Sequence, residues 1–119
     1  MSTKQIGYSA EQKALEYLIG QGLKLVSHNY SCRFGEIDLI MRDKSFLVFI
    51  EVRARSNMSF GGGITSITYA KRQKIIKTTS HYLIKHQLQD KFPMRFDVLS
   101  IDGISGSITW LKDAFRADY

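Results

Sequence analysis

The sequence predicts one domain of the α/β (mixed α+β) class, in which helices cover a single central mixed sheet. The chain has 119 residues, a length typical of one domain. Stretches rich in β-branched and aromatic residues are interspersed with two stretches whose apolar residues recur at helical spacing. No proline- or serine-rich linker divides the chain. We therefore expect a single domain over residues 1–119, ordered helix, three strands, helix, two strands, with residues 113–119 as a less ordered tail.

Two segments are predicted to be helices. Residues 3–19 carry apolar side chains three and four positions apart, and the glycines of residues 20–22 end this helix. Residues 69–86 form the second helix, with Ser66 or Thr68 as its N-cap. This helix is amphipathic, and its polar face is cationic. The apolar arc holds Ile75, Thr79, Tyr82 and Leu83, and the opposite side holds Lys74, Lys77 and Lys85.

The remaining apolar segments are predicted to be strands. Polar or glycine-containing turns bound them, which is typical of strands. Residues 56–68 include three consecutive glycines and little periodicity, and we interpret them as a flexible loop. The expected strands are residues 23–30, 36–41, 46–53, 95–101 and 107–111.

The chain is basic. Its 17 Lys and Arg residues against 11 Asp and Glu residues give a net charge of +6, which suits a polyanionic partner although many basic proteins bind none. The single cysteine, Cys32, has no partner for an internal disulfide. The start of the chain lacks the apolar core of a signal peptide, and the longest apolar run, residues 46–50, is too short for a membrane span. We expect a cytoplasmic protein.

Four charges interrupt the most hydrophobic hairpin: Glu36, Asp38, Glu51 and Arg53. Burying an unpaired carboxylate costs about 2 kcal/mol or more, so these groups need partners. One interpretation is a structural salt-bridge network with Arg53 or Arg55. The other is a site for Mg²⁺ or Mn²⁺, because carboxylates and phosphate oxygens are the ligands of such cations. Twelve residues separate Asp38 from Glu-Val-Arg at 51–53, a spacing that resembles the D-(x)n-(D/E)-x-K signature of restriction-endonuclease-like nucleases.

Several longer motifs point the same way. They are "GYSAEQKALEYLIGQG" (7–22), "NYSCRFGEIDLI" (29–40), "FIEVRAR" (49–55), "SFGGG…KRQKI" (59–75) and "RFDVLSI" (95–101). Together and in this order they resemble the YraN-like family of small bacterial proteins, which is assigned to the restriction-endonuclease-like (PD-(D/E)xK) fold. The resemblance implies one such domain and a similarity to Holliday junction resolvases.

The resemblance also implies roles for individual residues. Asp38 and Glu51 match the two acidic positions and would bind the metal, with the backbone carbonyl of Val52 as a further ligand. Glu11 resembles the first-helix glutamate of archaeal resolvases; the alternative is a glutamate in the first turn, stabilised by the helix dipole. Arg53 stands where the motif most often has lysine. Arginine orients phosphate but does not deprotonate usefully at neutral pH; the alternative is a structural arginine paired with Glu51 or Glu36.

Basic and amide groups of the second helix often approach the scissile phosphate in this fold. Lys71, Gln73 and Lys74 are therefore candidates for nucleic-acid contact, together with Arg55, and a solvated helix face is the alternative. For Glu36 we favour a salt bridge with Arg33 over a supporting role beside Asp38. Arg95 and Asp97 share a strand face, which predicts a structural ion pair.

Three functions are compatible with these residues. The first is a metal-dependent, structure-selective DNA endonuclease. The second is a non-catalytic nucleic-acid-binding module that retains the nuclease fold, which the replacement of lysine by Arg53 favours. The third is a protein–protein module that uses a sheet edge or residues 108–115. A choice between DNA and RNA, and between monomer and homodimer, does not follow from the sequence.

Overall fold

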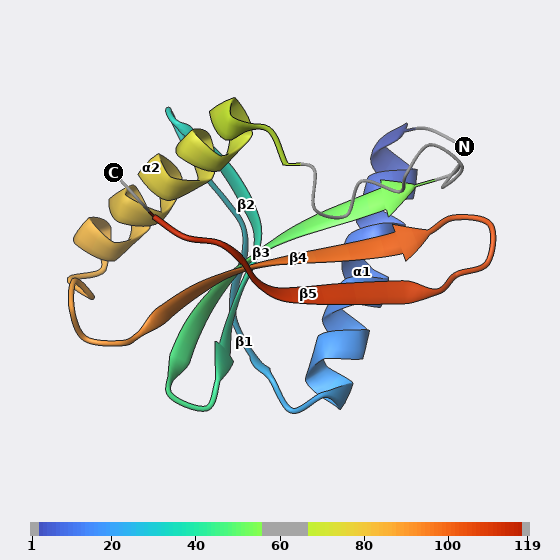
Figure 1. Ribbon diagram of the computed structural model, residues 1–119, viewed down its shortest axis with the longest axis horizontal. Helices are drawn as coiled ribbons and strands as arrows, with labels where there is room; N and C mark the ends of the chain where they lie inside the picture. Colours follow the sequence, from blue (N-terminus) through green and yellow to red (C-terminus); the bar gives the residue numbers. More distant parts are fainter. Residues whose placement is uncertain (1–2, 56–66, 118–119) are drawn as a thin grey trace.

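The computed structural model describes residues 3–55 and 67–117, with side chains for residues 10–54 and 67–117. Residues 56–66, which include most of the predicted glycine-rich loop, lie outside the described residues. The elements follow the predicted order, and Figure 1 shows how they are arranged. They are α1 (Thr3–Gly20), β1 (Lys24–Cys32), β2 (Gly35–Asp43), β3 (Phe46–Arg55), α2 (Tyr69–Lys85), β4 (Met94–Asp102) and β5 (Ile108–Phe115).

The five strands form one mixed sheet in the order β1-β2-β3-β4-β5. β1, β2 and β3 pair antiparallel, β3 and β4 pair parallel, and β4 and β5 pair antiparallel. A parallel pair requires a long crossover connection, and α2 lies in it. This arrangement confirms the predicted α/β class with a central mixed sheet.

The helices lie on opposite faces of the sheet. α2 packs over β1 and β2, and α1 lies behind the sheet against β1 to β4 (Figure 1). Successive side chains of β3 point to opposite faces of the sheet and contribute to both cores. Leu47 and Phe49 pack under α2, whereas Val48 and Ile50 pack under α1. β3 is therefore a central strand buried on both sides, as its continuous apolar run predicted.

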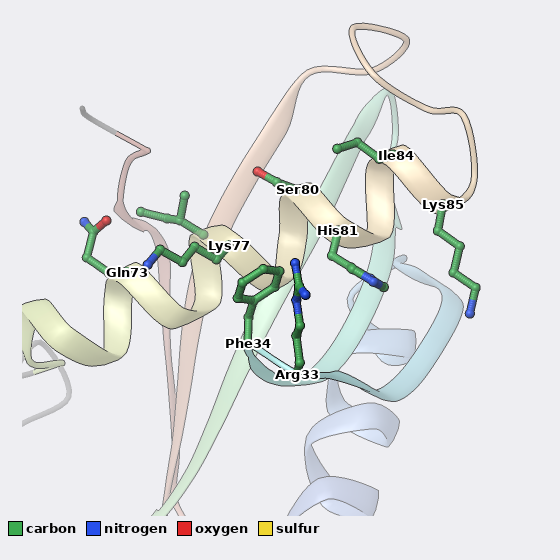
Figure 2. Close-up of a pocket in the computed structure, with 9 residues that line it drawn as sticks. Arg33, Phe34, Gln73, Lys77, Ser80, His81, Ile84 and Lys85 are labelled. Atoms are coloured by element: carbon green, nitrogen blue, oxygen red, sulfur yellow. The ribbon is translucent and has the colours of Figure 1, made fainter.

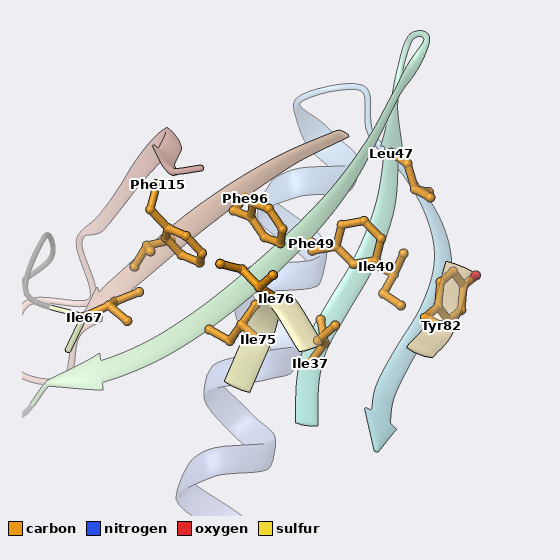
Figure 3. Packing of buried hydrophobic residues seen from close by; sticks show 11 residues of the cluster. Ile37, Ile40, Leu47, Phe49, Ile67, Ile75, Ile76, Tyr82, Phe96 and Phe115 are labelled. Atoms are coloured by element: carbon orange, nitrogen blue, oxygen red, sulfur yellow. The ribbon is translucent and has the colours of Figure 1, made fainter. Parts of the chain in front are cut away.

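An aromatic row forms much of the core under α2 (Figure 3). The rings of Phe49 and Phe96 lie 5.9 Å apart and those of Phe96 and Phe115 lie 4.9 Å apart, so that one ring follows the next across β3, β4 and β5. α2 covers this row with Ile75 and Ile76. The second core, under α1, is aliphatic and includes Ala14, Leu18, Leu39, Val48 and Leu99.

Element boundaries extend the predicted ones by a few residues. α2 begins at Tyr69, and its N-cap is Thr68, whose side chain accepts a hydrogen bond from the Lys71 amide at 3.1 Å. β5 continues through Phe115, four residues beyond the predicted strand end, and Phe115 is buried. The segment after Leu111 therefore contributes to the core.

Both edge strands are irregular. The pairing of β1 with β2 shifts register between Leu25 and Ser27, and Asn29 in β1 has φ 52°. The pairing of β5 with β4 shifts between Phe96 and Val98, and Asp113 in β5 has φ 54°. These irregularities are β-bulges, which bend a strand and raise its local twist.

Candidate active site

The candidate site lies where β2 and β3 separate. The ladder between them ends at the pair Leu39–Ile50, and side-chain alternation in β2 breaks at the next residue, because Ile37 packs under α2 whereas Leu39 packs under α1. The Asp38 carboxylate fills the gap and accepts a hydrogen bond from the Val52 amide at 2.8 Å. A side chain thus replaces the backbone partner that the ladder no longer supplies to β3.

Three carboxylates converge at this gap. Oxygen atoms of Glu11, Glu36 and Asp38 all lie within 4.8 Å of one another. Glu11 comes from the middle of α1, so the alternative of a first-turn glutamate is wrong. Glu36 and Asp38 come from β2. The predicted salt bridge between Glu36 and Arg33 is not among the ion pairs of the described residues; Arg33 lies over the Phe34 ring instead, 4.8 Å from its centroid.

Burial and neighbouring charges make ionisation of Asp38 unfavourable. The pKa of its carboxyl is raised from 3.8 to about 7, mainly by burial and next by the negative charge of Glu51, with smaller contributions from Glu11 and Glu36. The hydrogen bond from the Val52 amide acts in the opposite direction. A cation bound among these carboxylates would offset their negative charge and weaken the repulsion between them.

The Glu51 carboxylate forms an ion pair with a lysine of the second helix. Its Oε1 accepts from the Nζ of Lys71 at 2.9 Å, and the Glu51 side chain is only 11% exposed whereas that of Lys71 is 55% exposed. Lys71 lies in the first turn of α2, one turn after the Thr68 cap. Helix α2 therefore brings a flexible ammonium group against the second predicted acid.

A pocket of about 390 Å³ opens between β2, β3 and the start of α2. Acidic groups form one side and lysines the other, which is the charge distribution expected of a site that holds a cation and a phosphate together. Its lining residues are Gly35, Glu36, Asp38, Glu51, Thr68, Ala70, Lys71, Lys74 and Ile75.

Glu11 is fixed from the side of β1. The Asn29 amide lies 2.9 Å from Glu11 Oε2, and it donates a hydrogen bond there when its nitrogen faces the carboxylate. Asn29 has a positive φ of 52°, and it lies in β1 after the register shift between Leu25 and Ser27. Both residues line a smaller pocket of about 200 Å³ next to the acidic cluster.

The other predicted site residues are distributed around this centre. Arg53 is half-buried on β3 and follows Glu51 on the same face by strand alternation. Lys74 lines the acidic pocket, but Gln73 lines a neighbouring groove on the other side of α2. Val52 contacts the site through its amide. Arg55 ends β3, and its side chain lies outside the described residues.

Glu36 and Asn29 also lie at this site. For Glu36 a supporting role beside Asp38 was the less favoured alternative, suggested by the strand face that the two residues share. Asn29 was not predicted, because its contact with Glu11 depends on a positive φ that the sequence pattern does not indicate.

Within the described residues, no helix combines the length and apolar character needed to cross a membrane.

The chain resembles a family of known sequences. A model of the uncharacterised protein family UPF0102 matches residues 10–101. A UPF0102 protein of Legionella pneumophila (strain Corby) is 69% identical over 115 residues, which cover 97% of this chain and 98% of the relative. Another from Psychromonas ingrahamii is 52% identical over 110 residues, covering 92% and 88%. One from Coxiella burnetii (strain RSA 331 / Henzerling II) is 45% identical over 117 residues, covering 98% and 97%.

Proposed function

The chain belongs to the uncharacterised protein family UPF0102, and from its acidic pocket we propose that it is a metal-dependent, structure-selective DNA endonuclease with a restriction-endonuclease-like fold. The observation that carries the proposal is the convergence of Glu11, Glu36 and Asp38 at the gap between β2 and β3. Glu51 and Lys71 line the same gap from β3 and α2. Three carboxylates this close together supply the oxygen ligands that a divalent cation needs.

The donor set fits a hard divalent cation. Carboxylate oxygens are the preferred ligands of Mg²⁺ and Mn²⁺, and the pKa of Asp38 is raised first by burial and then by the neighbouring carboxylates. Asp38, Glu11 and Glu36 would hold the ion, and Glu51 would join them when Lys71 moves to substrate. The Val52 carbonyl faces β2, because a strand residue directs its amide and carbonyl towards the same neighbouring strand. When bound, the cation lowers the pKa of a ligated water and neutralises charge on a phosphate.

The protein's own groups position the DNA backbone. The exposed ammonium of Lys71 reaches the acidic pocket from α2 and would donate to a phosphate oxygen, in the role that the motif usually gives to lysine on the strand. Lys74 lies in the same pocket and adds a second positive charge. Arg53 follows Glu51 on β3 and orients a phosphate without giving up its proton. The Val52 amide keeps Asp38 in place during these events.

A second candidate function is a nucleic-acid-binding module without cleavage. It is favoured by Arg53 at the lysine position and by the ion pair in which Lys71 already occupies Glu51. In such a protein the acidic cluster would bind a cation that stabilises the fold, and DNA would dissociate intact.

Cleavage of a labelled DNA panel tests the proposal. Single strand, duplex, flap, gap and four-way junction are incubated with Mg²⁺, with Mn²⁺ or with a chelator. We expect metal-dependent cleavage of one class of structure, and loss of at least about 100-fold in rate for Asp38→Asn.

The matched control is Asp90→Asn, which makes the same change at an exposed position outside the pocket. This variant should cleave like the wild type. Equal cleavage by the wild type and Asp38→Asn would identify a contaminant. Retention of DNA without cleavage in any metal would replace the proposal with the binding module.

A further inference from the structure

A groove of about 970 Å³ runs along the outer side of α2 (Figure 2). The turn between β1 and β2 forms one wall with Arg33 and Phe34, which rise beside the helix, and Lys85 extends from the last helical turn. The groove is open, and its buried Ile76 also belongs to the core under α2. Its full lining is Arg33, Phe34, Gln73, Ile76, Lys77, Ser80, His81, Ile84 and Lys85.

The groove is cationic and partly apolar at the same time. Arg33, Lys77 and Lys85 are exposed, and no acidic residue belongs to the lining. Phe34 and Ile84 supply apolar surface, and Ile84 is 61% exposed, which is unusual for isoleucine in a helix that has an apolar face to bury. The guanidinium of Arg33 already lies over the Phe34 ring.

The groove and the acidic pocket are neighbours on one helix. Gly35 separates them, because the turn approaches α2 so closely there that a Cβ on Gly35 would lie 3.2 Å from Thr78 Oγ1 and 3.6 Å from Lys74 Cβ. Arg33 and Phe34 face the groove, whereas Gly35 and Glu36 face the acidic pocket. From Lys71 to Lys85 the helix extends about 21 Å at 1.5 Å per residue, which is long enough for several nucleotides.

We propose that this groove binds an unpaired DNA strand that continues from the acidic pocket. Lys77 and Lys85 contact the phosphates, and a base stacks on Phe34 or on the guanidinium plane of Arg33. This combination of a cationic track with an aromatic platform is how proteins bind single strands without reading their sequence. An acidic peptide would satisfy the lysines, but its carboxylates offer no aromatic plane to stack on Phe34 or on the Arg33 guanidinium. The inference deepens the proposed nuclease function, since it selects substrates with a single-stranded arm.

Binding is measured in chelator, so that cleavage does not interfere. The probe is a fluorescently labelled oligothymidylate of about 16 nucleotides, followed by anisotropy at several salt concentrations. We expect the double variant Lys77→Glu/Lys85→Glu to bind at least tenfold more weakly. The slope of log affinity against log salt should become shallower by about 1.4, because two phosphate contacts to a single strand are lost.

A second variant tests the stacking platform. Phe34→Leu keeps apolar bulk but removes the ring, and it should weaken binding between about fivefold and a hundredfold, whereas Phe34→Tyr should retain affinity. Thermal unfolding followed by circular dichroism verifies that both variants fold.

The matched control is Lys13→Glu/Lys112→Glu, which makes the same charge change at two exposed lysines, one on α1 and one on the far edge strand β5. If this control weakens oligothymidylate binding as much as the groove variants do, binding depends on general electrostatic attraction, and the proposed groove is refuted. Equal weakening of duplex binding by the groove variants would overturn the preference for an unpaired strand. Preferential binding of an acidic peptide such as polyglutamate would replace DNA as the occupant.

These results are separable from those on the nuclease function. If the groove variants lose affinity for oligothymidylate while the wild type cleaves no DNA, the strand-binding groove is supported and the nuclease function is refuted. If the wild type cleaves a DNA structure and the groove variants cleave and bind it equally well, the nuclease function is supported and the strand-binding groove is refuted.

Discussion

Asp38 is the residue on which fold and site both depend. Its carboxylate closes the gap between two central strands through the Val52 amide, yet burial and the charge of Glu51 raise its pKa to about 7. The same side chain is therefore structurally useful and electrostatically costly near neutral pH. Such a conflict is typical of residues retained for function.

The raised pKa of Asp38 predicts a pH-dependent stability. The folded protein binds the Asp38 proton more tightly than the unfolded chain does, so stabilisation by this group is complete below pH 4 and is lost as the pH rises through about 7. Asp38→Asn keeps an oxygen to accept from Val52 but carries no charge. We expect this variant to be more stable than the wild type at pH 8, by about 1–4 kcal/mol, and nearly equal at pH 4.

Urea unfolding at pH 4, 6 and 8 measures this difference. Asp90→Asn is the control, because the exposed Asp90 should leave the pH profile unchanged. Identical pH profiles for the wild type and Asp38→Asn would contradict the assigned electrostatics.

Replacing Lys71 should change metal binding and the rate of cleavage in opposite directions. In the ion pair with Glu51 its ammonium competes with a cation for the carboxylate. Replacing it by methionine, Lys71→Met, should therefore strengthen Mn²⁺ binding several-fold while lowering cleavage by about 100-fold. Calorimetry with Mn²⁺ and single-turnover cleavage measure the two effects. Weaker metal binding in this variant would show that Lys71 supports the ligands rather than competing with the ion.

At the scale of single residues the sequence predicted the acids better than their partners. Asp38 and Glu51 follow from charges in an apolar hairpin, and Glu11 from its resemblance to the first-helix glutamate of archaeal resolvases. The ion pair of Glu51 with Lys71 did not follow, because it depends on where α2 docks across 20 residues of sequence. Glu36 was expected to pair with Arg33, and that expectation failed because the aromatic ring of Phe34 holds the guanidinium.

At the scale of elements, β4 and β5 are joined by one buried carboxylate. Asp97 is 1% exposed and accepts hydrogen bonds from the Arg95 side chain, from Trp110 Nε1 and from the Asp113 amide, each at 2.9 Å. The predicted ion pair of Arg95 with Asp97 is confirmed. The Asp113 amide is available to Asp97 because of the bulge in β5.

Asp97→Asn should destabilise the fold by about 3 kcal/mol, since it removes the buried one of the two carboxylates that pair with Arg95 and leaves only Asp43. Asp113→Asn alters an exposed carboxylate on the same bulge, and its cost should stay within about 0.5 kcal/mol. Urea midpoints of the two variants test the difference. A small effect of Asp97→Asn would mean that the neutral hydrogen bonds alone hold β5.

The elements themselves were largely predictable, because apolar period and capping residues specify them locally. Both helices and all five strands occur where the patterns place them, and Thr68 is the N-cap. The end of β5 was missed, since "KDAF" alternates poorly. Its pairing depends on Phe96 opposite Phe115, a contact between distant parts of the chain.

At the scale of the whole molecule, the acidic cluster connects the two sides of the protein. Glu11 belongs to the helix behind the sheet, and Glu36 and Asp38 belong to the sheet itself. A bound cation would thus fasten α1 to β2. Binding to the native state alone stabilises a protein by about 2.7 kcal/mol when the ligand is at 100 times its dissociation constant.

We expect Mn²⁺ to raise the unfolding temperature of the wild type and to leave that of Glu11→Gln almost unchanged. Glu16→Gln makes the same change at an exposed position of the same helix, and this control should respond like the wild type. Differential scanning calorimetry at increasing Mn²⁺ measures the shift. An equal response of Glu11→Gln would remove Glu11 from the ligands.

The global fold followed from the sequence as far as class, element order and family. The YraN-like motifs predicted the family, and the match of the UPF0102 model confirms it. The contact between the β1–β2 turn and α2 at Gly35, and hence the groove, did not follow. It arises from the close approach of backbone to helix, which no local pattern records.

The two bulged edge strands have a consequence for how copies of this protein meet. A flat, regular edge invites another molecule to add its own strand and so begins ordered aggregates. Here a register shift and a left-handed residue interrupt the exposed edges of both β1 and β5. We expect these irregularities to hinder continuous stacking of copies at high concentration, and to favour self-association through surfaces other than the rims of the sheet.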